Sequence, residues 1–335
     1  MRAALIHGAH RLGLGEVATP TAGPGEVRVK VAYVGICGSD LSYYRKGAVG
    51  SFEVREPLIP GHEVSGTIDE DPSGTLAVGT PVTIHPATPG TCLPGLEQRP
   101  NIWPGSRYLG SAMTMPHSQG AMSEYVVVRA DQVRPVPAGL SLRDAVLAEP
   151  LGVGLHAVTI SGDLAGRTVL VSGAGPIGLL AAGAAVAKGA REVWVSDVLP
   201  AALERARALG VTGTVDVSET PLPTEAYDVV IEAAGVPSAI SGALNAAVRG
   251  GTVVQVGLIA GGTHPIDLSP IAARELVYRG SFRFLDEISD AVAMLHAQPS
   301  LSQVITHEFA LDDVVAAFDC ASDSARSAKV VVRLA

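Results

Sequence analysis

Residues 168–178 read Thr-Val-Leu-Val-Ser-Gly-Ala-Gly-Pro-Ile-Gly, an apolar run that leads directly into a turn with three glycines. The stretch that follows, up to Ala187, contains no charged residue and is suited to a buried helix. A strand, a glycine turn and a helix in this order form the cradle that holds the pyrophosphate of a dinucleotide. We therefore expect the residues of this turn to contact such a cofactor: Gly173, Gly175, Pro176, Ile177 and Gly178.

Asp197 strengthens this interpretation, because it ends the next apolar run and lies 19 residues after Gly178. A carboxylate at that place accepts hydrogen bonds from the ribose hydroxyls. No arginine occurs among residues 198–204, and the charge of Asp197 would repel a 2′-phosphate. The sequence thus favours NAD over NADP. The alternative is a glycine-rich contact between helix and strand, with Asp197 as a helix N-cap before Pro200.

The second half of the chain alternates between predicted strands and helices. Between two of the strands we expect a helix over residues 199–209. Such alternation is typical of a doubly wound parallel sheet, a Rossmann domain, over residues 155–286. The predicted strands cover residues 168–172, 193–196, 228–232, 252–256 and 278–282.

The first half has a different character. Short β-rich segments such as residues 27–31 and 124–128 are separated by Gly and Pro, which predicts an irregular β-barrel domain over residues 1–154. Residues 287–335 show two helical periodicities and a last strand at 329–333, and we expect this segment to return to the first domain. The predicted fold class is α/β.

Composition limits the partners. The 335 residues carry a net charge of −9 without any Lys/Arg run, so nucleic acid and anionic membranes are disfavoured and small molecules are expected. Three cysteines are too few for a disulfide framework, and the N-terminus shows no export signal, which favours the cytoplasm. The uncharged run at 168–187 contains the glycine turn and suits a strand and buried helix better than a membrane span.

Four residues of the first half offer metal ligands: Cys37, His62, Glu63 and Glu149. A thiolate, an imidazole and a carboxylate suit zinc, and three protein ligands leave a fourth position open for an alcohol. Taken singly, each residue has an ordinary explanation. Cys37 is a small hydrophobe, His62 a turn residue, and Glu149 a charge at a helix end.

Several segments resemble the zinc-dependent medium-chain dehydrogenases, in the order and spacing of that family. They are Gly-Ile-Cys-Gly-Ser-Asp-Leu-Ser-Tyr-Tyr at 35–44, Pro-Gly-His-Glu-Val at 60–64, Glu-Pro-Leu at 149–151, and the glycine turn at 173–178. Within the superfamily, the chain is most similar to sorbitol dehydrogenase-like enzymes, and among them to the L-idonate 5-dehydrogenases. The segments that carry this narrower resemblance are residues 47–52, 110–113, 116–117 and 279–284.

The resemblance implies a GroES-like catalytic domain, one catalytic zinc per chain, NAD as cofactor, and a homo-oligomer, either a dimer or a tetramer. It implies that Cys37 and His62 bind zinc, while Glu63 and Glu149 compete for the carboxylate place. Ser39 is expected to hydrogen-bond the alcohol and begin a proton relay.

The resemblance also implies that Tyr43 and Arg283 line the substrate pocket, with Arg45 and Lys46 as further cations able to meet a carboxylate. The expected reaction is oxidation of a sugar acid, L-idonate to 5-keto-D-gluconate. A sorbitol or xylitol dehydrogenase is the alternative. A zinc-free quinone reductase-like enzyme and a non-catalytic nucleotide-binding protein are the candidates from other classes.

Two departures from the family pattern stand out. Many relatives carry a structural zinc lobe with four cysteines, whereas residues 89–104 contain only Cys92, so we expect a metal-free loop held by its prolines and Trp103. Ser42 occupies a place where many members have a histidine that passes the proton to solvent. The proton is then expected to leave through water, the ribose hydroxyls or another side chain.

Overall fold

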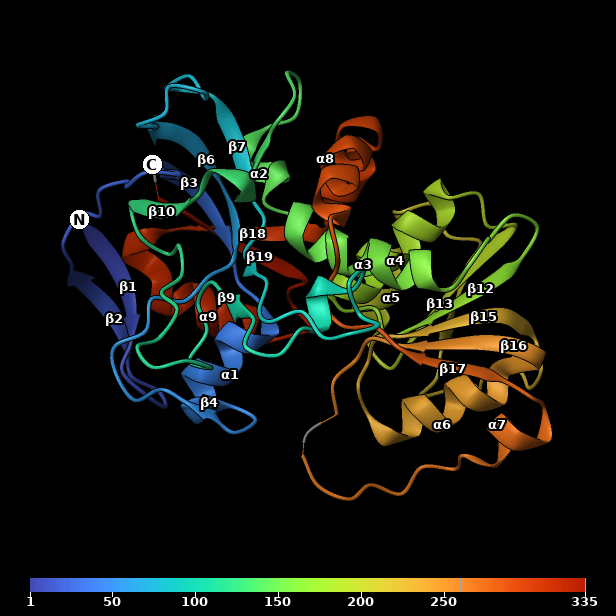
Figure 1. Ribbon diagram of the computed structural model, residues 1–335. Coiled ribbons are helices and arrows are strands. Elements are labelled where there is room, and N and C mark those ends of the chain that lie inside the picture. The colour runs from blue at the N-terminus through green and yellow to red at the C-terminus, as the bar shows by residue number, and fades with distance from the viewer. Residues whose placement is uncertain (260, 335) are drawn as a thin grey trace.

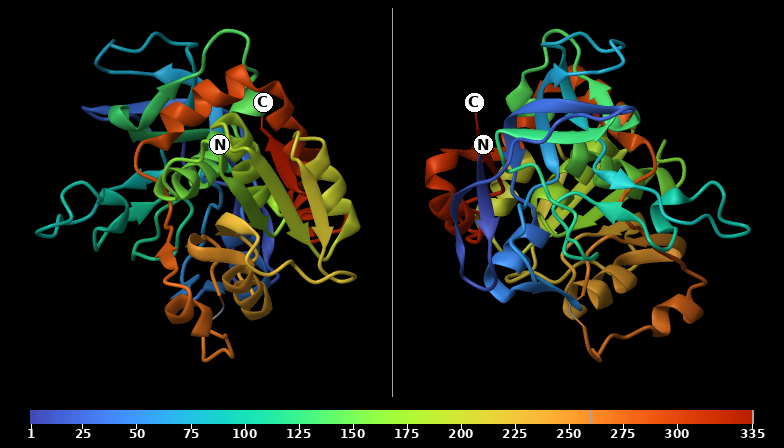
Figure 2. Two further views of the ribbon diagram at one scale, coloured as in Figure 1. Left: turned by 90° about the vertical axis from the view of Figure 1, so that its right-hand side faces the viewer. Right: turned by 60° about the vertical axis from the view of Figure 1, so that its left-hand side comes forward.

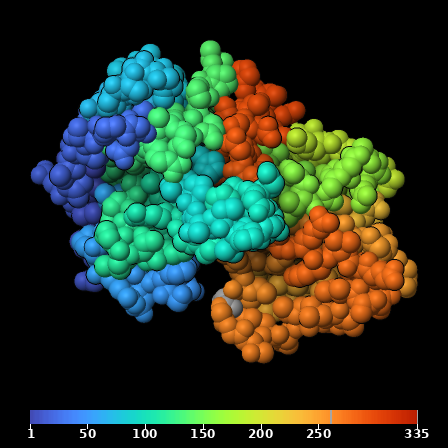
Figure 3. Space-filling view, viewed as in Figure 1, coloured from blue at the N-terminus to red at the C-terminus, as the bar shows by residue number. Residues whose placement is uncertain are grey.

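The computed structural model describes residues 1–259 and 261–334. Two parts lie side by side, a β-rich part that contains the N-terminus and a part built on a parallel sheet (Figure 1). This agrees with the predicted α/β class. In the space-filling view a notch separates the blue residues of the first part from the orange residues of the second (Figure 3).

The β-rich part is built on a seven-stranded sheet in the order β11-β7-β6-β3-β19-β18, with β10 also paired to β3. Strand β3 alternates in burial, and its residues Val27, Val29 and Val31 point into the core with no exposed surface. The strands of this sheet are β3 (Glu26–Gly35), β6 (Glu63–Glu70), β7 (Pro81–Ile84), β10 (Tyr125–Arg129), β11 (Val133–Pro135), β18 (Ile305–Ala310) and β19 (Lys329–Arg333).

Smaller elements surround this sheet. The first helix begins three residues after the end of β3. These elements are β1 (Arg2–Ile6), β2 (Leu12–Glu16), α1 (Gly38–Lys46), β4 (Ala48–Val49), β5 (Phe52–Glu53), β8 (Ala87–Thr88), β9 (Arg107–Tyr108), α2 (Leu142–Ala145), and two 3₁₀ turns at Pro100–Ile102 and Ala130–Gln132.

The second part is a six-stranded parallel sheet in the order β14-β13-β12-β15-β16-β17. Its central strand is buried on both faces, because Val169 and Val171 pack into one hydrophobic cluster and Leu170 into another. The elements are β12 (Thr168–Ser172), α4 (Pro176–Ala187), β13 (Glu192–Asp197), α5 (Pro200–Arg207), β14 (Gly213–Asp216), β15 (Tyr227–Glu232), α6 (Pro237–Ala246), β16 (Ala247–Gln255), α7 (Ser269–Ala273) and β17 (Val277–Gly280).

The predicted Rossmann fold is therefore confirmed. Strand order reverses between β12 and β15, and in such sheets ligands bind at the carboxyl ends of the strands beside this point. The glycine turn leaves the carboxyl end of β12 and reaches this crevice. No described helix combines the length and the apolar character that a membrane crossing requires.

Helix α3 (Ala148–Ile160) joins the two parts and packs against α4 and α8 (Glu287–Ala297). The predicted domain boundary between residues 154 and 155 falls inside this helix. After α8 the chain returns through a 3₁₀ turn at Pro299–Val304, β18, a 3₁₀ turn at Leu311–Asp313, and α9 (Val314–Ala321) to β19, which pairs antiparallel with β3. The red helix α9 lies against the blue N-terminal strands (Figure 2, right).

Two predicted elements differ in their bounds, and two strands were not predicted. The helix expected over residues 199–209 spans only Pro200–Arg207, and the strand expected at 278–282 ends at Gly280. Strands β14 and β18 were not predicted: β14 is four residues long, begins with glycine and is only half-buried, and β18 has no strict alternation of apolar residues.

Candidate metal and cofactor site

Asp40 ties together the two loops that carry Cys37 and His62. Cys37 precedes α1, and its backbone N–H donates to Oδ2 of Asp40 over 3.0 Å. The backbone N–H of Gly61 donates to Oδ1 of the same carboxylate over 3.1 Å. Asp40 has no exposed surface, so both hydrogen bonds are shielded from solvent. It fixes the loop after β3 against the loop before β6.

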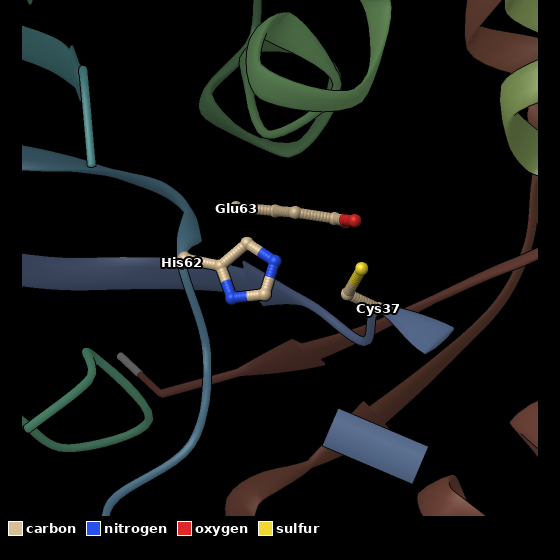
Figure 4. Close-up of side chains that lie close together, drawn as sticks. All are labelled: Cys37, His62 and Glu63. Atoms are coloured by element: carbon tan, nitrogen blue, oxygen red, sulfur yellow. The ribbon is translucent and has the colours of Figure 1, made fainter. Parts of the chain in front are cut away.

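Cys37, His62 and Glu63 form a cluster in which the sulfur, a ring nitrogen and a carboxylate oxygen lie within 4.8 Å of one another. The three side chains point toward a common space (Figure 4). Glu63 begins β6 and faces Gly35 of β3, and a Cβ at Gly35 would approach Oε2 of Glu63 to 2.0 Å. Glycine is therefore required at this position to leave room for the carboxylate.

The cluster fits a zinc ion. Among the residues that the structure describes, Oε2 of Glu63 is buried without a hydrogen-bond partner; Nδ1 of His62 also lacks one and lies 4.0 Å from Oδ1 of Asp40. Burial acts to lower the pKa of His62, but the negative charges of Cys37, Asp40 and Glu149 outweigh it and raise that pKa to about 10. Such a site favours a cation, and its thiolate, imidazole and carboxylate are the donors that zinc prefers. A zinc ion bound there supplies Lewis-acid chemistry, which lowers the pKa of an alcohol.

The second carboxylate, Glu149, stands in the first turn of α3 and is buried. It is near the cluster but is not one of the three residues whose donor atoms all lie within 4.8 Å of one another. Its Oε1 accepts a hydrogen bond from the hydroxyl of Tyr108 over 2.5 Å. Burial raises the pKa of Glu149, with the charge of Glu63 acting in the same direction and that of His62 against it.

Two further residues predicted for the pocket, Ser39 and Tyr43, belong to α1. Ser39 is in the first turn of α1, two residues after Cys37, and is half-buried. Tyr43 is buried, and its hydroxyl accepts a hydrogen bond from the backbone N–H of Ala112 over 3.0 Å. The hydroxyl of Ser42 donates to the carbonyl of Gly38 over 2.9 Å and is thus occupied within α1.

Arg283 lies between two aromatic rings, 4.2 Å from the ring centre of Tyr108 and 4.8 Å from that of Phe282. Burial lowers the pKa of Arg283, while Tyr108, Glu149 and Tyr43 act to raise it. Its backbone adopts a left-handed conformation with φ of 52°, which costs about 1–3 kcal/mol in a residue other than glycine. Arg45 reaches the carbonyl of Ser322, on the side of α9.

The glycine turn fits a dinucleotide. A Cβ at Gly178 would lie 1.8 Å from the carbonyl oxygen of Gly173, so the close approach of helix and turn depends on that glycine. Beside Gly175 there is open space, which leaves its backbone accessible to a pyrophosphate. Helix α4 begins at Pro176 and directs its N-terminal N–H groups toward the turn.

Asp197 ends β13 next to this turn. Its Oδ2 accepts from the backbone N–H of Ala174 over 2.7 Å, and its Oδ1 accepts from that of Leu199 over 2.9 Å. Each carboxylate oxygen has a second lone pair, so both can still accept a hydroxyl hydrogen from a ribose. The position at the carboxyl end of β13 is the one that the sequence predicted.

Comparisons with known proteins agree with this geometry. Residues 23–138 match the alcohol dehydrogenase GroES-like domain, and residues 176–297 match the zinc-binding dehydrogenase domain. The L-idonate 5-dehydrogenase (NAD(P)(+)) of Escherichia coli K12 is 34% identical over 309 residues, which cover 90% of each chain. The chain belongs to the zinc-dependent medium-chain dehydrogenase family.

Other relatives and solved structures support the same family. The sorbitol dehydrogenase of Bacillus subtilis is 33% identical over 93% of this chain and 91% of the relative. The crystal structure of the Escherichia coli L-idonate 5-dehydrogenase superposes with a TM-score of 0.93 at 32% identity, covering 99% of this chain and 98% of that chain. The 2R,3R-butanediol dehydrogenase of Bacillus subtilis gives a TM-score of 0.88 at 28% identity, covering 100% and 99%.

This family of oxidoreductases has a GroES-like domain and a Rossmann domain, as predicted, and zinc and NAD are the cofactors expected of its members. The structure adds three residues to which the sequence had given no role: Asp40, Tyr108 and Lys329. Asp40 could have been found as the third residue of a helix that starts after Cys37. A lysine inside the apolar run 328–332 also signals a buried ion pair. Nothing in the sequence around Tyr108 indicates its contact with Glu149.

Residues 89–104, where many relatives carry four cysteines, form an exposed lobe, which is the projecting cyan loop in Figure 2, right. The indole N–H of Trp103 donates to the carbonyl of Leu96 over 2.7 Å, which ties the two sides of the lobe together. Cys92 is exposed and forms no disulfide.

Proposed function

We propose that this chain oxidises a secondary alcohol of a sugar acid, L-idonate to 5-keto-D-gluconate, and passes the hydride to NAD. Membership of a zinc-dependent polyol and sugar-acid dehydrogenase family supplies the chemistry, and the substrate is the part proposed here. In this proposal Cys37, His62 and Glu63 are the protein ligands of one zinc ion.

The observation that carries the substrate assignment is the small number of hydrogen bonds made by the guanidinium of Arg283. Among the described residues its guanidinium makes one hydrogen bond, to the hydroxyl of Ser106 over 3.3 Å. The remaining N–H groups are therefore available to a ligand. Stacking on Tyr108 fixes the guanidinium beside Glu149 and Tyr43, which places a cation at the pocket that an acid substrate would enter.

The other residues predicted for the site have separate roles in the proposed reaction. Ser39 begins the proton relay: its oxygen accepts the hydroxyl proton of the substrate while its own proton passes to water, a ribose hydroxyl or another side chain. Ser42 does not take the place of a histidine in this relay, because its hydroxyl is bonded to the carbonyl of Gly38. Tyr43 forms one wall of the pocket. The glycine turn would hold the pyrophosphate and Asp197 the ribose of the dinucleotide, whose nicotinamide would accept the hydride.

We also propose a homo-oligomer in the cytoplasm, either a dimer or a tetramer. Strand β17 is the edge of the parallel sheet, and all four of its residues are exposed, among them Val277 and Tyr278. An apolar edge strand can pair with the same strand of a second copy and remove both edges from water.

The experiment that tests the substrate is an NAD-linked assay with L-idonate, D-gluconate, sorbitol and xylitol. Removing the charge-assisted bond in Arg283→Ala should reduce kcat/KM for L-idonate by about ten- to a hundredfold, and for a neutral polyol by less. The exposed Arg45 supplies the matched control, because Arg45→Ala also removes an arginine, but one whose guanidinium reaches the carbonyl of Ser322 on the side of α9.

If sorbitol or xylitol is the better substrate of the unmodified enzyme, the idonate assignment fails and a polyol dehydrogenase takes its place. The sorbitol dehydrogenases among the relatives make this the second candidate. Zinc-independent reduction of quinones by the reduced nicotinamide cofactor, or no turnover at all, would indicate the zinc-free or non-catalytic classes instead.

A further inference from the structure

Tyr108 touches three residues of the site at once. Its hydroxyl donates to Oε1 of Glu149 over 2.5 Å. Its ring packs edge-to-face against the imidazole of His62, with 5.3 Å between the ring centroids and an interplanar angle of 67°. The guanidinium of Arg283 lies over the ring at 4.2 Å. With 8% of its surface exposed, Tyr108 is the enclosed centre of this group.

Glu63 and Glu149 both place a carboxylate near one metal position, but an open site has room for only one of them as a ligand. Cys37, His62 and Glu63 already make three protein ligands, and a catalytic zinc site keeps its fourth position open. If Glu149 also bound the ion, four protein ligands would close the site as in structural zinc centres. A carboxylate at this place must therefore be restrained for the site to remain open to substrate.

Each carboxylate has one oxygen engaged by a different donor, and only Glu63 belongs to the cluster with Cys37 and His62. Lys329 engages Oε1 of Glu63 and leaves its Oε2 buried and unpartnered, ready to bind a cation. Glu149 stands in the first turn of α3, and its Oε1 accepts a hydrogen bond from the hydroxyl of Tyr108. Glu149 is not among the three residues whose donor atoms all lie within 4.8 Å of one another.

We propose that Tyr108 is a positioning residue that keeps Glu149 out of the metal's ligand set and so preserves the open coordination position. The inference rests on the zinc site of the proposed function. It adds a residue that acts through Glu149 and touches neither the metal nor the hydride. Arg283, stacked on the ring, holds Tyr108 in the orientation that this bond requires.

The test compares Tyr108→Phe with Tyr44→Phe. Tyr44 offers a matched control, because its hydroxyl also donates to a carboxylate, that of Asp319 over 3.3 Å, away from the site. Zinc release to the chromogenic chelator 4-(2-pyridylazo)resorcinol is followed for each holoenzyme, together with kcat and the Kd for NAD. Each variant is also made in a Glu149→Ala background.

The proposal predicts that zinc leaves Tyr108→Phe more slowly than the unmodified enzyme, by about fivefold or more, because Glu149 becomes a fourth ligand. We expect kcat to fall about tenfold while the Kd for NAD stays within about twofold. In the Glu149→Ala background the same substitution should change neither quantity further, since there is no carboxylate left to restrain. Tyr44→Phe should behave like the unmodified enzyme.

Faster zinc loss from Tyr108→Phe would show that Tyr108 only supports the packing of the ligands, and this would overturn the proposal. Unchanged zinc release with unchanged kcat would overturn it as well. An effect that persists in the Glu149→Ala background would contradict action through Glu149. An unmodified enzyme without bound zinc would overturn the proposed function itself, which separates that failure from the failure of Tyr108 alone.

Discussion

The ε-ammonium of Lys329 lies 2.5 Å from Oε1 of Glu63, and only 3% and 1% of the two side chains are exposed. Lys329 opens β19 and also donates to the carbonyl of Ile36 over 3.0 Å. The last strand of the chain thus supplies a counterion to a carboxylate of the metal cluster.

Breaking this ion pair should destabilise the metal-free protein strongly. Lys329→Met leaves the carboxylate of Glu63 buried without its cation, and such a loss costs about 3–5 kcal/mol of the free energy of unfolding. Urea unfolding after zinc removal measures the effect. The exposed pair of Arg129 with Asp131 provides the control, because Arg129→Met should cost less than about 1 kcal/mol. Equal losses for the two variants would contradict the role given to Lys329.

Two glycines of the cofactor turn should respond differently to alanine. Gly178→Ala brings a Cβ to 1.8 Å from a backbone oxygen, so it should lower the free energy of unfolding by about 1–3 kcal/mol or more. Gly175→Ala adds its methyl group to open space and should keep stability within about 1 kcal/mol. It should nevertheless weaken NAD binding about tenfold or more, because the methyl group occupies the place of the pyrophosphate. Retained NAD affinity in Gly175→Ala would refute the placement of the dinucleotide.

Asp197 should select NAD over NADP. A 2′-phosphate about 5 Å from its carboxylate meets roughly 3 kcal/mol of repulsion per unit charge at an effective dielectric near 20. The preference in kcat/KM is then at least about a hundredfold. Asp197→Asn keeps an acceptor for the backbone N–H of Ala174 and removes the charge, so the preference should fall sharply. Comparable kcat/KM for both cofactors in the unmodified enzyme would exclude this assignment.

The sequence could predict features that depend on neighbouring residues, but not contacts between residues that are far apart along the chain. Strand β12 was predicted at its observed bounds, because its apolar run ends at the glycines that begin the turn. The family resemblance implied Cys37 and His62 as zinc ligands and left Glu63 and Glu149 as alternatives for the carboxylate; in the structure Glu63 lies in the cluster with Cys37 and His62. Glu63 and Lys329 are 266 residues apart, and their contact depends on the register of β19 against β3, which local patterns do not encode.

The same limit explains why Tyr108 was missed. It lies in the two-residue strand β9, and its approach to Glu149 depends on how that segment folds against α3. Burial alone could be expected for such a tyrosine, but its hydroxyl partner lies 41 residues away in sequence. By contrast, Asp40 is three residues from Cys37 and its role follows from the start of α1.

The junction of the two parts should be sensitive to acid. Oε1 of Glu287 in α8 lies 2.7 Å from Nδ1 of His156 in α3. Burial acts to raise the pKa of Glu287, but the hydrogen bond and charge of His156 outweigh it and lower that pKa. The folded protein then binds fewer protons than the unfolded chain, so this contribution is present above the unfolded pKa of about 4.3 and is lost as pH falls through the lower folded value.

Glu287→Gln removes this titration. Urea unfolding between pH 3 and pH 7 should show a stability difference between the unmodified protein and the variant that is largest near neutrality and shrinks below about pH 4. A difference that is constant over the whole range would contradict the assigned direction of the shift.

The most direct test of the whole account is a zinc titration of the metal-free protein, with NADH formation from the best substrate recorded at each step. The account predicts that activity rises with bound zinc and reaches its plateau at one ion per chain, and that Cys37→Ala neither holds the ion nor turns over. Full activity of the metal-free protein, or a plateau that requires a second tightly bound zinc, would contradict it.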